Sequence, residues 1–130
     1  MKKKFVYTQR APEPVGPYSQ AIKAKGWLYI SGQIPVNAAT GELVQGPFEQ
    51  QVRTVLDNIG AILTAGGAGF DTVVKVTVYL ADMERFAEMN AIYDEYFSES
   101  RPARACVEVK RLPKDFPIEI DAVALCDESS

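Results

Sequence analysis

The stretch Thr72-Val73-Val74-Lys75-Val76-Thr77-Val78-Tyr79-Leu80 decides the fold class. Valine and threonine dominate it, and its even positions are apolar, whereas its odd positions include Lys75, Thr77 and Tyr79. Alternation with a period of two is typical of a β-strand that buries one face. The stretch therefore predicts a strand whose even-numbered valines face the core.

Helical patterns lie on both sides of this strand. Before it, apolar residues recur every three or four positions: Phe48, Val52, Val55, Leu56, Ile59, Ile62 and Leu63. Gly46-Pro47 is expected to begin this helix and Gly66-Gly67 to end it. After the strand, Asp82 is expected to cap a second helix, which Pro102 stops. Its buried stripe is predicted to be Phe86, Met89, Tyr93 and Phe97.

Further strands are expected near both ends of the chain. The extended Pro-rich segment 11–17 leads into a strand near residues 18–22, and the Lys25-Gly26 turn joins it to a strand over 27–34. Residues 103–109 and 118–125 are expected to form the last two strands. The order strand, strand, helix, strand, helix, strand, strand predicts an α+β fold with a mixed sheet and two helices on one face.

Composition limits the chemistry that the chain can perform. With 130 residues, 47% hydrophobic residues and a net charge of -3, residues 1–130 are expected to form a single globular domain. The absence of histidine excludes a Ser-His-Asp triad, a Cys-His pair and the HExxH zinc motif. Cys106 and Cys126 are too isolated to hold a metal ion.

Charge and hydropathy also limit the partners that we expect. The mildly acidic balance gives no basic surface for nucleic acid or anionic lipid. No apolar run approaches the roughly 20 residues of a membrane span, and Met1-Lys2-Lys3-Lys4 is followed by no signal-peptide core. We therefore expect a cytoplasmic protein whose partner is a small molecule or another copy of the chain.

Polar residues on the last two predicted strands suggest a site. Arg104 and Cys106 share one face of their strand, and Glu119 lies opposite the core-facing Ile118 and Ile120. If both apolar rows face the helices, then Arg104, Cys106 and Glu119 lie on one common face. That face also holds aromatic and charged residues, so we expect it to pack against another subunit around a polar interfacial site.

Each candidate residue has a functional and a purely structural interpretation. Arg104 could bind a carboxylate through its planar fork, or it could form an ion pair with Glu119 or Asp121. Glu119 could be a general acid/base whose pKa is raised by burial, or it could be an ordinary paired or solvent-exposed charge. Cys106 is expected to line a pocket rather than to act as a nucleophile.

Asn90 and Tyr18 complete the set of candidates that the pattern raises. Asn90 lies on the apolar side of its helix, where its amide needs a partner, and capping of a nearby backbone group is the alternative role. Tyr18 lies in a Pro- and Gly-rich loop that could reach a neighbouring subunit, where it could also serve only as a packing anchor.

Several motifs together resemble one protein family. They are Gly16-Pro17-Tyr18-Ser19-Gln20-Ala21, Ser31-Gly32-Gln33-Ile34-Pro35, residues 102–109 (PARACVEV), and Leu112-Pro113-Lys114-Asp115 followed by Ile118-Glu119-Ile120. In this order, from about Tyr7 to Leu125, they resemble the Rid (YjgF) family. The arginine at position 104 resembles that of its RidA subgroup of 2-iminobutanoate/2-iminopropanoate deaminases.

This resemblance implies a chorismate-mutase-like homotrimer with the open sheet face inward and clefts between subunits. It implies hydrolysis of 2-aminoacrylate, 2-aminocrotonate and their imino tautomers to 2-keto acids and ammonia, without metal or organic cofactor. In the implied site, Arg104 holds the substrate carboxylate and Glu119 manages water and a proton. The implied substrate-binding wall comprises Tyr18, Ser31, Gly32, Asn90 and Cys106, with Lys75 as a weaker candidate.

Two functional hypotheses remain open at this point. The alternative to the deaminase is a non-catalytic metabolite-binding or chaperone-like stress protein of the same fold. A ribonuclease would have to work without histidine and without a basic face. The stretch between Phe97 and Pro102 is short for the family, which affects the expected rim of the cleft.

Overall fold

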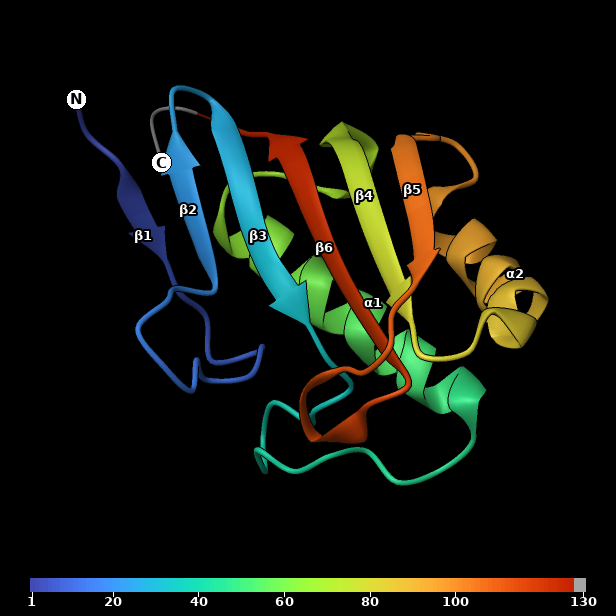
Figure 1. Ribbon diagram of the computed structural model, residues 1–130. Helices are drawn as coiled ribbons and strands as arrows, with labels where there is room; N and C mark the ends of the chain where they lie inside the picture. The colour runs from blue at the N-terminus through green and yellow to red at the C-terminus, as the bar shows by residue number, and fades with distance from the viewer. Residues whose placement is uncertain (128–130) are drawn as a thin grey trace.

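The chain forms a single sheet that is covered by helices on one side (Figure 1). The computed structural model describes residues 1–127. The six strands follow the order β1-β2-β3-β6-β4-β5, with β4 and β5 parallel and the other neighbours antiparallel. The elements are β1 (Lys4–Val6), β2 (Ala21–Ala24), β3 (Trp27–Gln33), α1 (Phe48–Ala65), β4 (Val73–Leu80), α2 (Phe86–Phe97), β5 (Ala103–Glu108) and β6 (Ile118–Leu125). The predicted α+β mixed sheet is confirmed.

Strand β1 was not predicted from the sequence. It pairs with β2 at the edge of the sheet, where Phe5 lies opposite Ile22. Its three residues begin with the last of three consecutive lysines, and the segment is too short to show an alternating pattern.

Helix α1 forms as its apolar spacing predicts. All seven residues of the expected stripe are buried, and they pack against the inner face of the sheet. Pro47 precedes the helix in an extended conformation, and Gly66 ends it, followed by Gly67 at φ 77°. Burying each large aliphatic side chain of this kind contributes roughly 1.5–3 kcal/mol.

Helix α2 begins through a short 3₁₀ turn. Asp82 accepts a hydrogen bond from the Glu84 amide at 3.0 Å, as expected of a cap, but it caps the turn Met83–Arg85 that runs into the α-helix. Met89, Tyr93 and Phe97 are buried, and Phe86 is half-buried. The predicted stripe is therefore correct, with Phe86 at its less buried end.

A bulge in β4 changes one predicted core residue. Val73 lies opposite Ala124 and Lys75 opposite Val123, so Val74 is an extra residue between two successive pairs. Val73, not Val74, consequently faces the core with Val76 and Val78. The expectation that Val74 belongs to the core row is wrong at this position.

The prediction that Arg104, Cys106 and Glu119 share one face is also wrong. Arg104 pairs with Val76 and Cys106 with Val78, which face the helices. Glu119 pairs with Tyr79 on the opposite face. The physical reason is that β5 is an edge strand in parallel register, which turns its alanine and valine row outward and leaves Val107 41% exposed.

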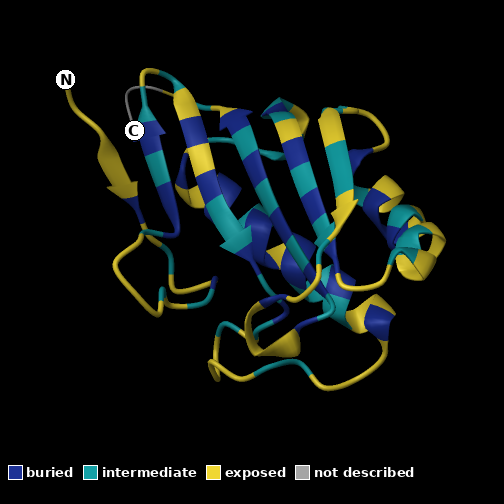
Figure 2. Cartoon of the chain, in the orientation of Figure 1, coloured by how far each residue is buried: buried dark blue, intermediate teal, exposed yellow. Residues whose placement is uncertain are grey.

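Helices do not cover the second face of the sheet (Figures 1 and 2), and large apolar side chains are exposed on it. Trp27, Tyr29 and Leu125 are 39%, 49% and 47% exposed there. Tyr79, Glu119 and Asp121 add polar groups, so this open face is neither a closed core nor a typical solvated surface. Neither helix within residues 1–127 is long and apolar enough to cross a membrane.

Candidate functional site

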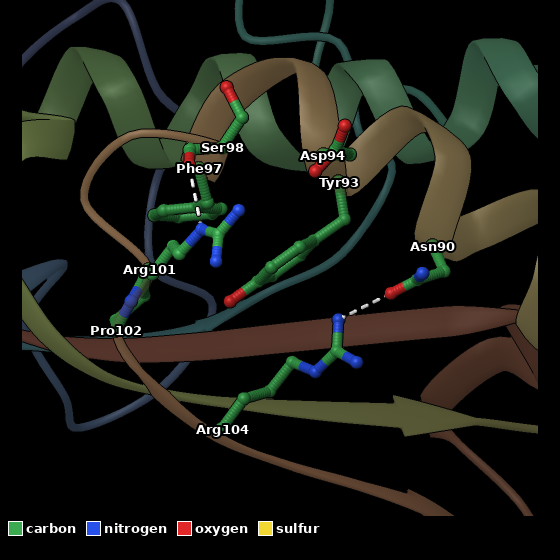
Figure 3. A pocket seen from close by; sticks show the side chains of 8 residues that line it. All are labelled: Asn90, Tyr93, Asp94, Phe97, Ser98, Arg101, Pro102 and Arg104. Carbon is green, nitrogen blue, oxygen red and sulfur yellow. Dashed lines mark hydrogen bonds between the residues drawn. The ribbon is translucent and has the colours of Figure 1, made fainter.

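Arg104 lies near the start of β5, and its side chain extends beneath α2 (Figure 3). Its Nη1 donates a hydrogen bond to Asn90 Oδ1 at 2.7 Å. The guanidinium carbon stands 4.6 Å from the Tyr93 ring centroid and 5.6 Å from that of Phe86. Among residues 1–127, no ion pair includes Arg104, so the structure does not show the alternative pairing with Glu119 or Asp121.

Asn90 and Tyr93 hold this guanidinium because α2 places them on one side. They are three residues apart, which brings both side chains to the same helical face. The Asn90 amide oxygen is used by Arg104 rather than by a helix end, so its alternative role as a cap is not observed. The tyrosine was predicted only as a core residue, and its spacing from Asn90 is the signal that could have placed it in the site.

A cavity of about 380 Å³ opens beside Arg104, and we call it the arginine pocket. It is lined by Asn90, Tyr93, Asp94, Phe97, Ser98, Arg101, Pro102 and Arg104. The short connection between α2 and β5, which was expected to shape the rim of a cleft, forms one of its walls. No sequence signal pointed to Arg101, since one exposed arginine in a loop carries no pattern.

Burial controls the protonation of the groups around Arg104. It raises the pKa of the Cys106 thiol, and the positive charge of Arg104 opposes that rise. It also raises the pKa of the Tyr93 hydroxyl, again against the effect of Arg104. Both groups therefore stay protonated at neutral pH. Cys106 is not part of the lining of the arginine pocket, and its raised pKa does not suit a nucleophile.

A second group of predicted residues gathers on the open face, and we call it the glutamate cluster: Ser31, Gly32 and Glu119. The Glu119 carboxylate lies against Gly32, and a Cβ at that position would stand 2.8 Å from the carboxyl carbon. Ser31 Oγ donates a hydrogen bond to the Ser19 carbonyl at 2.6 Å, which ties β3 to the loop that carries Tyr18. Tyr18 is 50% exposed.

The loop that carries Tyr18 is fixed by Gln20, which is only 2% exposed. Its Nε2 donates to the carbonyls of Thr8, Ala11 and Pro12 at 3.0, 3.2 and 2.9 Å. Its Oε1 accepts from the Thr8 amide at 2.8 Å. One buried amide thus replaces the ladder bonds that the proline-rich segment cannot make.

Glu119 has the electrostatic setting of a proton-transfer group. Its pKa is raised first by burial and then by the negative charge of Asp121. Tyr79, which pairs with Glu119, donates a hydrogen bond to Asp121 Oδ2 at 3.0 Å. A carboxyl group whose pKa moves towards neutrality can both accept and return a proton.

The structure thus divides the predicted site into two groups. Arg104, Asn90 and Cys106 lie on the helix side of the sheet, and the glutamate cluster lies on the open face. Lys75 is exposed opposite Val123 on the open face, at the β5 side of the sheet. The first group can bind a carboxylate and the second can transfer a proton, but one copy of the chain does not bring them together.

The same fold and sequence pattern occur in known proteins. A family model described as endoribonuclease L-PSP matches residues 8–126. A RutC family protein of Pyrococcus horikoshii is 58% identical over 122 residues, which make up 94% of this chain and 97% of that protein. A Bos taurus protein named 2-iminobutanoate/2-iminopropanoate deaminase is 45% identical over 123 residues, covering 95% of this chain and 90% of that protein.

A solved structure extends this likeness to three dimensions. The crystal structure of E. coli TdcF with bound serine superposes with a TM-score of 0.89 at 40% identity, and the match covers 95% of this chain and 99% of that one. The family model spans nearly the whole chain, which confirms the resemblance drawn from the sequence motifs. The chain therefore belongs to the endoribonuclease L-PSP family, which is also called the Rid or YjgF family.

Proposed function

We propose that this protein is a deaminase of the RidA type. It hydrolyses enamines and imines of small 2-amino acids, such as 2-aminoacrylate and 2-aminocrotonate, to 2-keto acids and ammonia. The observation that carries the proposal is Arg104, whose guanidinium lines a cavity and has no carboxylate partner among residues 1–127. The name of the bovine relative and the serine bound to TdcF support a ligand of the amino acid type.

Substrate binding would use the planar fork of Arg104. Asn90 Oδ1 accepts a hydrogen bond from Arg104 Nη1, which orients the guanidinium and leaves its other N–H groups free for a carboxylate. The Tyr93 and Phe86 rings support its faces. The protonated Cys106 thiol would not compete as a nucleophile.

The reaction needs one water molecule and one proton relay. Water adds to the imine: its oxygen bonds the carbon and one of its protons passes to nitrogen, which gives a carbinolamine. The hydroxyl proton then passes to nitrogen as the carbon–nitrogen bond breaks, which releases ammonia and leaves a keto group. Glu119 would accept the proton from water and return it to nitrogen, for which its raised pKa suits it. Gly32 leaves room for the carboxylate, and Ser31 and Tyr18 would complete the wall.

A complete site would need two copies of the chain. Arg104 and Glu119 lie on opposite faces of one sheet, so a neighbouring subunit would have to supply the second group. The exposed Trp27, Tyr29 and Leu125 give the open face the apolar surface that a subunit interface requires. We propose a homotrimer with this face inward and one cleft between each pair of subunits.

The test generates 2-aminoacrylate in situ with a serine dehydratase, with semicarbazide present to capture free imine. The wild-type protein is expected to speed pyruvate release and to reduce semicarbazone formation, whereas Arg104→Ala should do neither. If wild type and a protein-free control behave alike, the deaminase proposal is rejected for this substrate. The non-catalytic metabolite-binding alternative would then be the better description.

A further inference from the structure

The arginine pocket contains more positive charge than a small monocarboxylate requires. Besides Arg104, its wall includes Arg101, an exposed guanidinium whose Nε donates to the Ser98 carbonyl at 3.1 Å. No ion pair within residues 1–127 uses Arg101. Asp94 is the acidic residue of the lining, so two guanidiniums face one carboxylate. The pocket therefore favours an anion with more than one negative charge.

The backbone fixes Arg101 beside the pocket. Its φ is 44°, in the left-handed region, and its amide donates to the Phe97 carbonyl at 3.0 Å. This turn closes the end of α2 and leads through Pro102 directly into β5. Since Arg101 and Arg104 are three residues apart, their Cα atoms are separated by at most about 10 Å. One small ligand can therefore reach both guanidiniums.

A buried hydroxyl between the two arginines supplies a second, independent sign of a ligand. Tyr93 is only 7% exposed, and its hydroxyl makes no hydrogen bond of normal geometry within residues 1–127, although Arg104 lies close enough to oppose the rise of its pKa. Figure 3 shows this hydroxyl directed between Arg101 and Arg104. A buried hydroxyl without a partner costs about 1–3 kcal/mol, so it is normally satisfied by water or by a ligand.

The size of the pocket agrees with a longer ligand. Its volume of about 380 Å³ lies within the range of small-molecule sites. At about 30 Å³ for each water molecule, it has room for roughly twelve waters, more than a three-carbon acid would displace. Its lining follows α2 from Asn90 to Phe97 and continues through Ser98 to Arg101.

We propose that the arginine pocket selects imino acids that carry a second acidic group at the end of the side chain. Arg104 binds the 2-carboxylate, Arg101 binds the distal acid, and the Tyr93 hydroxyl donates a hydrogen bond to a ligand oxygen. The identity of the ligand as an imino acid rests on the proposed function. The preference for a diacid is a property of the pocket and is tested by binding alone.

The test measures the affinity of the purified protein for 2-oxoglutarate and 2-oxopentanoate by titration calorimetry. These keto acids have the same chain length and differ in the distal carboxylate. The wild type is expected to bind 2-oxoglutarate more tightly. Arg101→Gln should lower the affinity for 2-oxoglutarate about threefold to tenfold, the effect of losing one charge-assisted contact at an exposed site. It should leave the affinity for 2-oxopentanoate unchanged.

Three further variants sharpen the result. Arg101→Lys should keep part of the preference because it keeps the charge but loses the fork. Lys2→Gln removes the same charge beside β1, at the opposite edge of the sheet, and should leave both affinities unchanged. Tyr93→Phe should weaken the binding of 2-oxoglutarate, because it removes the hydroxyl that donates a hydrogen bond to the ligand. Thermal unfolding checks that this variant is folded.

The proposal is overturned if the wild type binds the two acids equally or binds neither, or if the preference survives Arg101→Gln. An equal loss in Lys2→Gln would also reject it, because the effect would then be one of net charge. The 2-aminoacrylate assay gives a separate answer. A protein that is inactive there but prefers 2-oxoglutarate through Arg101 rejects 2-aminoacrylate as the substrate and retains the diacid pocket.

Discussion

The carboxylate of Glu119 occupies the space where any residue other than glycine at position 32 would place its Cβ. That Cβ would overlap Glu119 Oε2 and lie 2.8 Å from the carboxyl carbon and 3.1 Å from Cγ. Gly32 therefore determines where the carboxylate of the glutamate cluster stands. The glycine is required by this close approach and not by its backbone conformation, since its φ lies outside the left-handed region.

Gly32→Ala is expected to reduce deaminase activity more than stability. The glutamate side chain can rotate away from the new methyl group, so the fold should lose no more than about 1 kcal/mol, whereas the carboxylate leaves its position. Activity in the 2-aminoacrylate assay should fall at least about tenfold, and thermal unfolding should show the intact fold. Unchanged activity would mean that the position of Glu119 does not matter to the reaction.

Arg104→Ala is expected to lower kcat/KM by at least about 100-fold, the upper part of the range for loss of a hydrogen bond to a charged group, which leaves no acceleration above the protein-free control. Arg104→Lys should recover little of it, because an ammonium cannot form the two parallel bonds of the guanidinium. Arg85→Ala is a matched control, since its guanidinium also stands 4.6 Å from a ring centroid, that of Phe48. Equal losses in the two alanine variants would point to folding instead of binding.

Stability should depend on pH through Glu119. Because its pKa in the folded chain lies above the ordinary value of 4.5, the folded state holds the proton more tightly than the unfolded state. This contribution is fully present below about pH 4.5 and is lost as the pH rises through the raised pKa. The Glu119→Gln side chain stays neutral at every pH. As the pH rises from about 4.5 through the raised pKa, the melting temperature of this variant should therefore increase relative to that of the wild type.

Thermal unfolding of both proteins from about pH 4 to pH 8 measures this difference. Glu99→Gln, an exposed glutamate in the loop after α2, serves as the control. In a chain that keeps Glu119, Asp121→Asn should narrow the pH range over which stability changes, since the Asp121 charge is the second cause of the raised Glu119 pKa. A constant difference at all pH values would show that Glu119 titrates normally.

Gln20→Ala should destabilise the chain by several kcal/mol. The substitution removes the hydrogen-bond partner shared by the Thr8 amide and the carbonyls of Thr8, Ala11 and Pro12. Each of these groups that stays buried without water destabilises the folded state by about 1–3 kcal/mol. Denaturant unfolding gives the loss directly. Gln9→Ala changes an exposed side chain within the same segment, between Thr8 and Ala11, and should change stability by less than about 0.5 kcal/mol.

The local elements of the fold could be predicted because each has a periodic pattern. The α1 stripe, the alternation of β6 and the Lys25-Gly26 turn all appear in the structure as expected. Where a pattern was interrupted, the prediction failed. The bulge at Val74 replaces one core valine by its neighbour, and no feature of a valine-rich run marks where an extra residue falls.

The site was harder to predict because it depends on how strands pair. Arg104 and Glu119 were correctly placed on strands, yet the face of an edge strand follows from its register with β4, which local alternation does not contain. Arg101 could not be found at all, since a loop arginine becomes a pocket residue only when α2 packs above β5. Tyr93 was predicted only as a core residue, and its spacing from Asn90 was the one signal of its place in the site.

The opposite placement of Arg104 and Glu119 leads to a test of the proposed assembly. Arg104→Ala and Glu119→Ala should each be inactive alone. If each cleft takes Arg104 from one subunit and Glu119 from its neighbour, refolding the two variants together in equal amounts should restore roughly a quarter of the sites. A site contained in one copy would regain nothing. The 2-aminoacrylate assay, before and after mixed refolding, separates the two arrangements, and wild type refolded in the same way sets the full scale.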